Sequence, residues 1–84
     1  MHPGTPDADV RAVAAHIRQY LSEHPHAADT AQGIQRWWLL PSFGELALTT
    51  VEAALLQLET EGVVRRIESA WAPAAWARAL GTGR

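Results

Sequence analysis

Histidine is the residue type in this 84-residue chain that most suggests metal or acid–base chemistry. His24 and His26 flank a proline and His16 lies upstream, but this spacing does not match a standard zinc site. The chain contains no cysteine, and no serine lies in a G-x-S-x-G nucleophile motif. We therefore expect no enzyme activity, no cofactor and no bound metal, and interpret the histidines as solvated residues near a helix end.

A second group of side chains could contact nucleic acid. Thr49, Thr50 and Gln57 carry groups that can hydrogen-bond to base edges, and Arg65 and Arg66 could contact phosphates. The overall charge gives little support, because the net charge is -2 and the seven basic residues are all arginines. Nucleic-acid binding by these five residues is therefore our alternative prediction.

A third group is apolar and could anchor a protein partner. The adjacent Trp37 and Trp38 would point about 100° apart on a helix, so both cannot be central in one apolar stripe. We expect Trp38 in the core and Trp37 at its edge, with exposure of one ring for partner binding as the alternative. Leu56 lies off the apolar stripe of its helix, and together with Trp71 and Trp76 it could complete an apolar patch that would indicate an interface. The predicted partner-binding residues are Trp37, Leu56, Trp71, Trp76, Arg65 and Arg66.

The composition is that of a single folded domain. Apolar residues make up 48% of the chain, which suits a globular fold and is unusual for a disordered one. The sequence shows neither an apolar run long enough for a membrane span nor a basic-then-apolar signal peptide. We expect a cytoplasmic protein that does not bind a membrane.

Three amphipathic segments are predicted to be helices. The first runs from the cap at Thr5 to about Glu23, because a residue before proline avoids the α region. The second runs over 29–39, where Asp29 and Gln32 have capping-box spacing. The third begins at Leu48 or Thr49 and ends at Glu61, before a C′ glycine. Together they are expected to bury a core of Val13, Ile17, Leu21, Ile34, Trp38, Val51, Leu55 and Leu58.

The remaining segments complete an α+β fold that is mostly α. Residues 40–44 are interpreted as a connection, and 63–67 favour a strand because they are rich in β-branched residues. After a turn at 68–70, Trp71 and Ala72 could begin a return strand. Pro73 suits the start of a short last helix, in which Trp76 and Leu80 would pack on the core, with a self-association role for that helix as the alternative. The predicted domain spans 6–81, with a disordered start at 1–5 and a loose tail at 82–84.

Residues 49–67 resemble the DNA-binding domains of GntR-type and MarR-type bacterial regulators. In the GntR-type pattern the helix reads approximately T-T-V-R-E-A-L-R-R-L-E-A-E-G, followed by L-V and basic residues. This resemblance implies a winged helix: a three-helix core, a β-hairpin wing over 63–72 and a short C-terminal helix. The matching framework residues are Thr49, Thr50, Val51, Ala54, Leu55, Leu58, Glu59, Glu61 and Gly62.

The departures from that pattern direct the functional prediction. Glu52, Leu56 and Gln57 stand where the family has arginines, so the helix lacks the cations that phosphate contacts need. We therefore predict a small winged-helix adaptor that binds another protein, with self-association as one form of it, and is not a strong DNA binder. The alternative is a DNA-binding transcriptional regulator that uses helix 49–61 and the wing, dimerised through its terminal helices.

Overall fold

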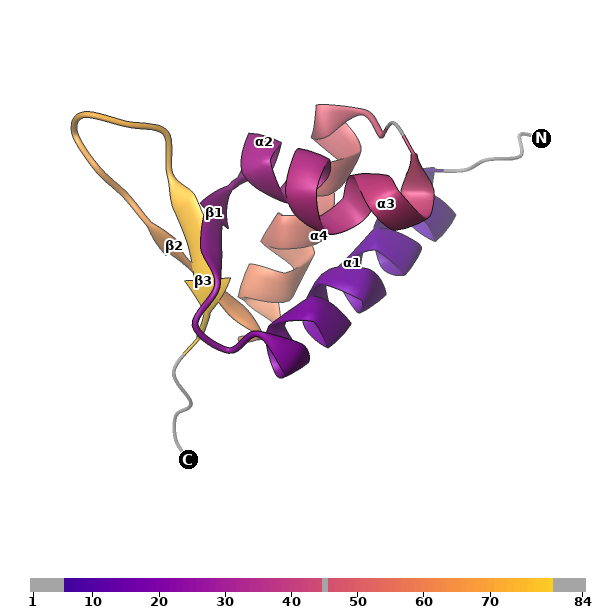
Figure 1. The fold of residues 1–84 in the computed structure, drawn as a ribbon, viewed down its shortest axis with the longest axis horizontal. Coiled ribbons are helices and arrows are strands. Elements are labelled where there is room, and N and C mark those ends of the chain that lie inside the picture. Colours follow the sequence, from indigo (N-terminus) through magenta and orange to yellow (C-terminus); the bar gives the residue numbers. More distant parts are fainter. Residues whose placement is uncertain (1–5, 45, 80–84) are drawn as a thin grey trace.

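Three helical segments and a three-stranded antiparallel sheet form the computed structural model, which describes residues 6–44 and 46–79 (Figure 1). The helices lie together on one side, and the hairpin that ends the described chain extends away from them. The predicted termini at 1–5 and 82–84, with Leu80 and Gly81, lie outside the described residues.

Helix α1 (Pro6–Glu23) has the predicted extent. Val13, Ile17 and Leu21 recur every four residues, so they lie on one face, and all three are buried. The His24 N–H donates to the Tyr20 carbonyl at 2.8 Å, and Pro25 then prevents another helical turn. This helix packs most extensively against α4.

The second helical segment differs from its prediction at both ends. It is continuous through α2 (Ala31–Gly33), the π-helical η1 (Ile34–Leu39) and α3 (Leu40–Phe43), so the expected connection at 40–44 is largely helical. The predicted Asp29–Gln32 capping box is wrong, because the hydroxyl of Thr30 accepts from the Gly33 N–H. In η1, the Leu40 N–H donates to the Gln35 carbonyl, five residues back.

Helix α4 (Leu48–Thr60) confirms the third prediction and buries Val51, Leu55 and Leu58. Gly62 follows the helix with φ of 79°, a left-handed conformation that favours glycine. The chain then enters β2 (Val64–Ile67) directly, because the Val63 N–H donates to the Leu58 carbonyl at 2.8 Å. The last turn of α4 therefore fixes where the hairpin starts.

The sheet contains one strand that the sequence did not predict and one that replaces a predicted helix. Its order is β1-β3-β2, with the short β1 (Ala28–Thr30) pairing with the central β3 (Ala75–Arg78). The expected C-terminal helix from Pro73 is wrong over its described part, and the return strand begins at Ala75 rather than Trp71. A helix this short is marginal alone, whereas β3 forms a ladder on both edges.

One core joins the helices to the sheet. It contains every core residue predicted from the sequence and adds Val64 and Trp76 from the two hairpin strands. The order of elements and the small antiparallel sheet are compatible with a winged-helix layout. Across the described ranges, no helix has both the length and the apolarity needed to cross a bilayer.

Candidate functional site

A groove lies where the start of the second helical segment, the solvent side of α4 and the hairpin meet. Its volume is about 470 Å³. Figure 1 shows that these three elements, far apart in sequence, surround one region beside the sheet. The lining is mainly apolar, and it consists of Thr30, Ala31, Gln32, Leu48, Glu52, Leu56, Arg66, Pro73, Ala74 and Trp76.

Three of the predicted partner-binding residues meet in this groove. Leu56 lies on α4 with 48% of its surface exposed, and Arg66 and Trp76 come from paired positions of β2 and β3. Trp76 is only 7% exposed, which confirms the expectation that it packs on the core, although it does so from a strand and not from a helix. Cross-strand pairing places its ring on the helix-facing side of the sheet, where it joins the core and also lines the groove.

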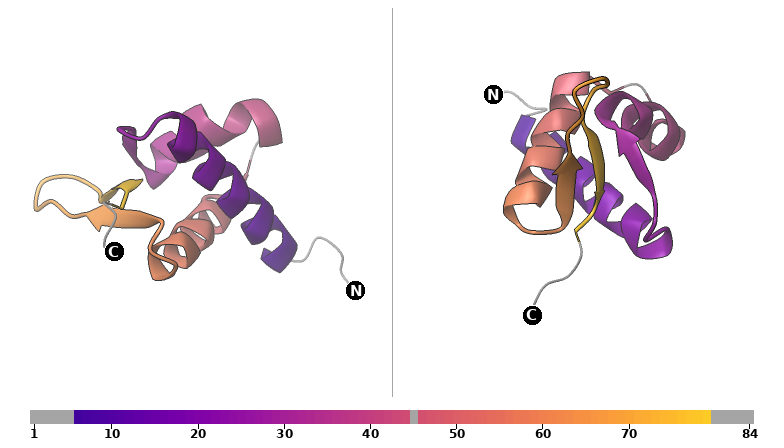
Figure 2. Two further views of the ribbon diagram at one scale, coloured as in Figure 1. Left: turned by 90° about the horizontal axis from the view of Figure 1, so that it is seen from below. Right: turned by 90° about the vertical axis from the view of Figure 1, so that its left-hand side faces the viewer.

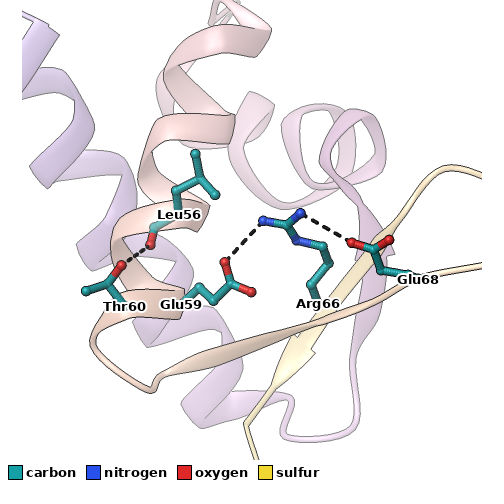
Figure 3. A network of polar contacts seen from close by, with 5 residues as sticks. All are labelled: Leu56, Glu59, Thr60, Arg66 and Glu68. Atoms are coloured by element: carbon teal, nitrogen blue, oxygen red, sulfur yellow. Dashed lines mark hydrogen bonds and ion pairs between the residues drawn. The ribbon is translucent and has the colours of Figure 1, made fainter.

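Arg66 is held by groups of the same chain. Its guanidinium donates to Glu59 of α4 at 3.2 Å and to Glu68 of the hairpin loop at 3.3 Å, as Figure 3 shows. The same group lies 4.9 Å from the centre of the Trp76 ring, within the range of a cation–π contact. Two carboxylates therefore offset the charge of this arginine, which is the one cation in the groove lining given above.

Glu52 supplies the remaining charge of the groove. It lies on the exposed side of α4, one turn before Leu56. Among residues 6–44 and 46–79, no basic group lies within ion-pair distance of its carboxylate. The groove therefore combines apolar walls with one uncompensated negative charge, a combination that disfavours a polyanion.

The predicted nucleic-acid residues are not brought together. Gln57 faces α1, where it lines a separate hollow with Arg11 and Arg18 and donates to Glu61 at 3.2 Å. Arg65 is exposed and alternates with Arg66, so it projects from the other face of the sheet, which faces the viewer in the right-hand view of Figure 2. Thr49 is exposed and Thr50 half-buried in the first turn of α4.

The two exposed tryptophans lie outside the groove lining. Trp71 is 93% exposed in the hairpin loop, and Trp37 is 67% exposed on η1. Trp38 is buried and stacks on Tyr20 with ring centres 4.3 Å apart, which confirms its expected place in the core, whereas the exposure of Trp37 matches the alternative of one exposed ring. Trp37 borders a second hollow, and Thr30 and Gln32 line both this hollow and the groove.

His16 of α1 and His24, which follows its last residue, lie beside aromatic rings. His16 meets Phe43 edge-on with ring centres 5.2 Å apart, and His24 lies 4.4 Å from Tyr20. Within the part of the chain that the structure describes, no three residues with metal-binding side chains are grouped. His16 is therefore a half-buried packing residue, and His24 is an exposed residue at the helix end.

Sequence reasoning missed the contribution of the second helical segment and of the hairpin loop to the groove. Thr30, Ala31 and Gln32 were assigned to helix two without a site role, although the Thr30 cap could have been recognised from its spacing to Gly33. Pro73 and Ala74 were assigned to a helix start. They reach the groove only because β3 returns beside β1, which is a long-range pairing.

The chain was compared with known families, curated proteins and solved structures. No protein-family model, curated protein or solved structure matches this chain. The resemblance of residues 49–67 to bacterial regulators therefore stays a prediction, and the groove must be interpreted from its own chemistry.

Proposed function

We propose that this chain is a small winged-helix adaptor that binds another protein through the groove between α4, the start of α2 and the hairpin. The observation that carries the proposal is that Arg66 is already paired with carboxylates of the same chain. The one cation of the lining is engaged by Glu59 and Glu68, while Leu56 remains half exposed. Apolar docking with a polar rim is the usual chemistry of a protein interface.

The distribution of charge supports a protein partner over DNA. A winged helix that reads DNA presents its recognition helix to the major groove and needs cations beside it. Here the exposed side of α4 carries Glu52 and Leu56, and Arg65 lies on the opposite sheet face from Arg66. Of the two arginines that line the hollow beside Gln57, Arg18 donates to Glu61 at 2.6 Å.

Site-specific photo-crosslinking tests this proposal. A photoreactive amino acid at position 56 should give a discrete protein adduct in the source cell, because this side chain lines the groove. The same group at position 67 is the matched control, since Ile67 is also partly exposed but lies on the other sheet face. Adding Leu48→Glu to the position-56 variant should abolish the adduct, provided that circular dichroism shows an intact fold.

The DNA alternative predicts a different result. In a gel-shift measurement, the native chain would then retard a random DNA duplex in a salt-dependent way, and replacing Arg65 and Arg66 with alanine would abolish the shift. That result would contradict the adaptor proposal. Equal adduct yields from positions 56 and 67 would contradict the assignment of the groove.

A further inference from the structure

The exposed part of η1 has a chemistry opposite to that of the groove. Trp37 is 67% exposed, and Leu40, the first residue of α3, is 42% exposed. Arg36 is exposed between them: it borders one hollow with Trp37 and another with Leu40. We call Arg36 and Trp37 of η1, together with Leu40 at the start of α3, the η1 knob. It consists of an aromatic ring, an aliphatic side chain and a cation.

The knob and the groove are complementary in charge as well as in apolar character. Within the part of the chain that the structure describes, Arg36 has no ion-pair partner, and neither has Glu52 of the groove. Arg66 competes little for Glu52 because Glu59 and Glu68 already hold its guanidinium. An occupant with an apolar anchor and an adjacent arginine would therefore compensate the negative charge of Glu52 in the groove. The η1 knob of this chain has both features.

The two surfaces are neighbours. The hollow beside Trp37 and the groove share Thr30 and Gln32 as lining residues. Because the knob and the groove adjoin on each copy, a two-fold axis between two copies allows each one to insert its knob into the groove of the other. Such an isologous arrangement closes as a dimer, whereas a head-to-tail contact would propagate.

We propose that the occupant of the groove is a second copy of this chain, which inserts its η1 knob so that two copies form a reciprocal dimer. Trp37 of each copy packs on Leu48 and Leu56 of the other, and Arg36 pairs with Glu52 across the interface. This inference rests on the proposed function of the groove as a protein-docking site, and it names the partner. Buried tryptophan and arginine are frequent energetic centres of protein interfaces.

A charge-swap experiment on the full chain tests the pairing. Sedimentation equilibrium should show a concentration-dependent dimer for the native chain. Arg36→Glu and Glu52→Arg should each weaken dimerisation by roughly tenfold or more, because each places like charges together. The double variant with both changes in one chain should restore dimerisation, since each interface then again pairs an acid with a base. Trp37→Ala should give a monomer.

Two control variants match these changes. Trp71→Ala removes an even more exposed tryptophan outside the knob, and Arg65→Glu reverses an exposed arginine on the other sheet face. Both should leave dimerisation unchanged. The inference is overturned if the native chain stays monomeric up to about 500 μM, which corresponds to an association weaker than about -4.5 kcal/mol. A dimer that withstands Trp37→Ala, or a double variant that remains monomeric, also overturns it.

The outcomes separate this inference from the proposed function. If position 56 crosslinks to a different protein while the native chain is monomeric, the adaptor function stands and self-pairing fails. If position 56 crosslinks neither to a second copy nor to another protein, both fail.

Discussion

At the scale of single residues, adjacent side chains of the same type have opposite surroundings. Trp38 stacks on Tyr20 in the core, whereas Trp37 is 67% exposed. Arg66 contacts two carboxylates and a tryptophan ring, whereas Arg65 is exposed on the other side of the strand. Residue type alone therefore does not identify a binding residue here. Within each pair, the same substitution can be compared at the buried or paired residue and at the exposed one.

The tryptophan pair gives a stability prediction. Trp38→Ala should lower the free energy of unfolding by about 3–5 kcal/mol, because it removes a large buried side chain and leaves a cavity. Trp37→Ala should change the stability of the monomer by less than about 0.5 kcal/mol, as exposed substitutions usually do. Urea unfolding followed by circular dichroism measures both, at concentrations low enough to suppress association. Similar losses for the two variants would contradict the burial of only one ring.

At the scale of elements, the second helical segment begins through local hydrogen bonds. The Thr30 hydroxyl accepts from the Gly33 N–H at 3.1 Å, and the Asp29 carboxylate accepts from the Thr30 N–H at 2.8 Å. Gly33 has a packing reason to lack a side chain, because a Cβ there would lie 1.9 Å from the Asp29 carboxylate. The helical cost of glycine is thus offset by the room it leaves for the strand-to-helix turn.

This turn predicts an energetic coupling between Asp29 and Gly33. Gly33→Ala alone should fail to give the gain of about 1 kcal/mol expected for removing a helical glycine, because Asp29 must move away. In an Asp29→Ala background the same change should give that gain, since the obstructing carboxylate is absent. Thermal or urea unfolding of the four proteins forms a double-mutant cycle. Independent effects of the two substitutions would show that the carboxylate does not restrict position 33.

At the scale of the whole molecule, helices and sheet share one core. Trp76 and Val64 bring the two hairpin strands into contact with the buried faces of the helices. Arg66 adds a second link from β2 to α4 through Glu59, although both groups are about one-third exposed and such pairs contribute little. We therefore expect the hairpin to unfold together with the helices, not separately.

Trp76→Ala tests this cooperativity. It should lower the free energy of unfolding by about 3–5 kcal/mol, because the ring is 93% buried between sheet and helices. Helical circular dichroism and the fluorescence of the remaining tryptophans should shift to the same lower midpoint. If the helical signal kept its native midpoint while fluorescence shifted, the hairpin would be an independent unit. Trp71→Ala is the control, with little change expected for a side chain that is 93% exposed.

The sequence alone determined α1, α4, the Gly62 stop and the buried helical residues. These features depend on the 3.6-residue periodicity, on glycine's tolerance of positive φ and on proline's effect on its neighbour, all of which act within a few positions. Tertiary structure decided β1, β3 and the pairing of Arg66 with Glu59 and Glu68. The segment after Pro73 has local helical character, but strand pairing on both sides outweighs it. The groove was not foreseeable because its walls come from three separate parts of the chain, and only long-range packing brings them together.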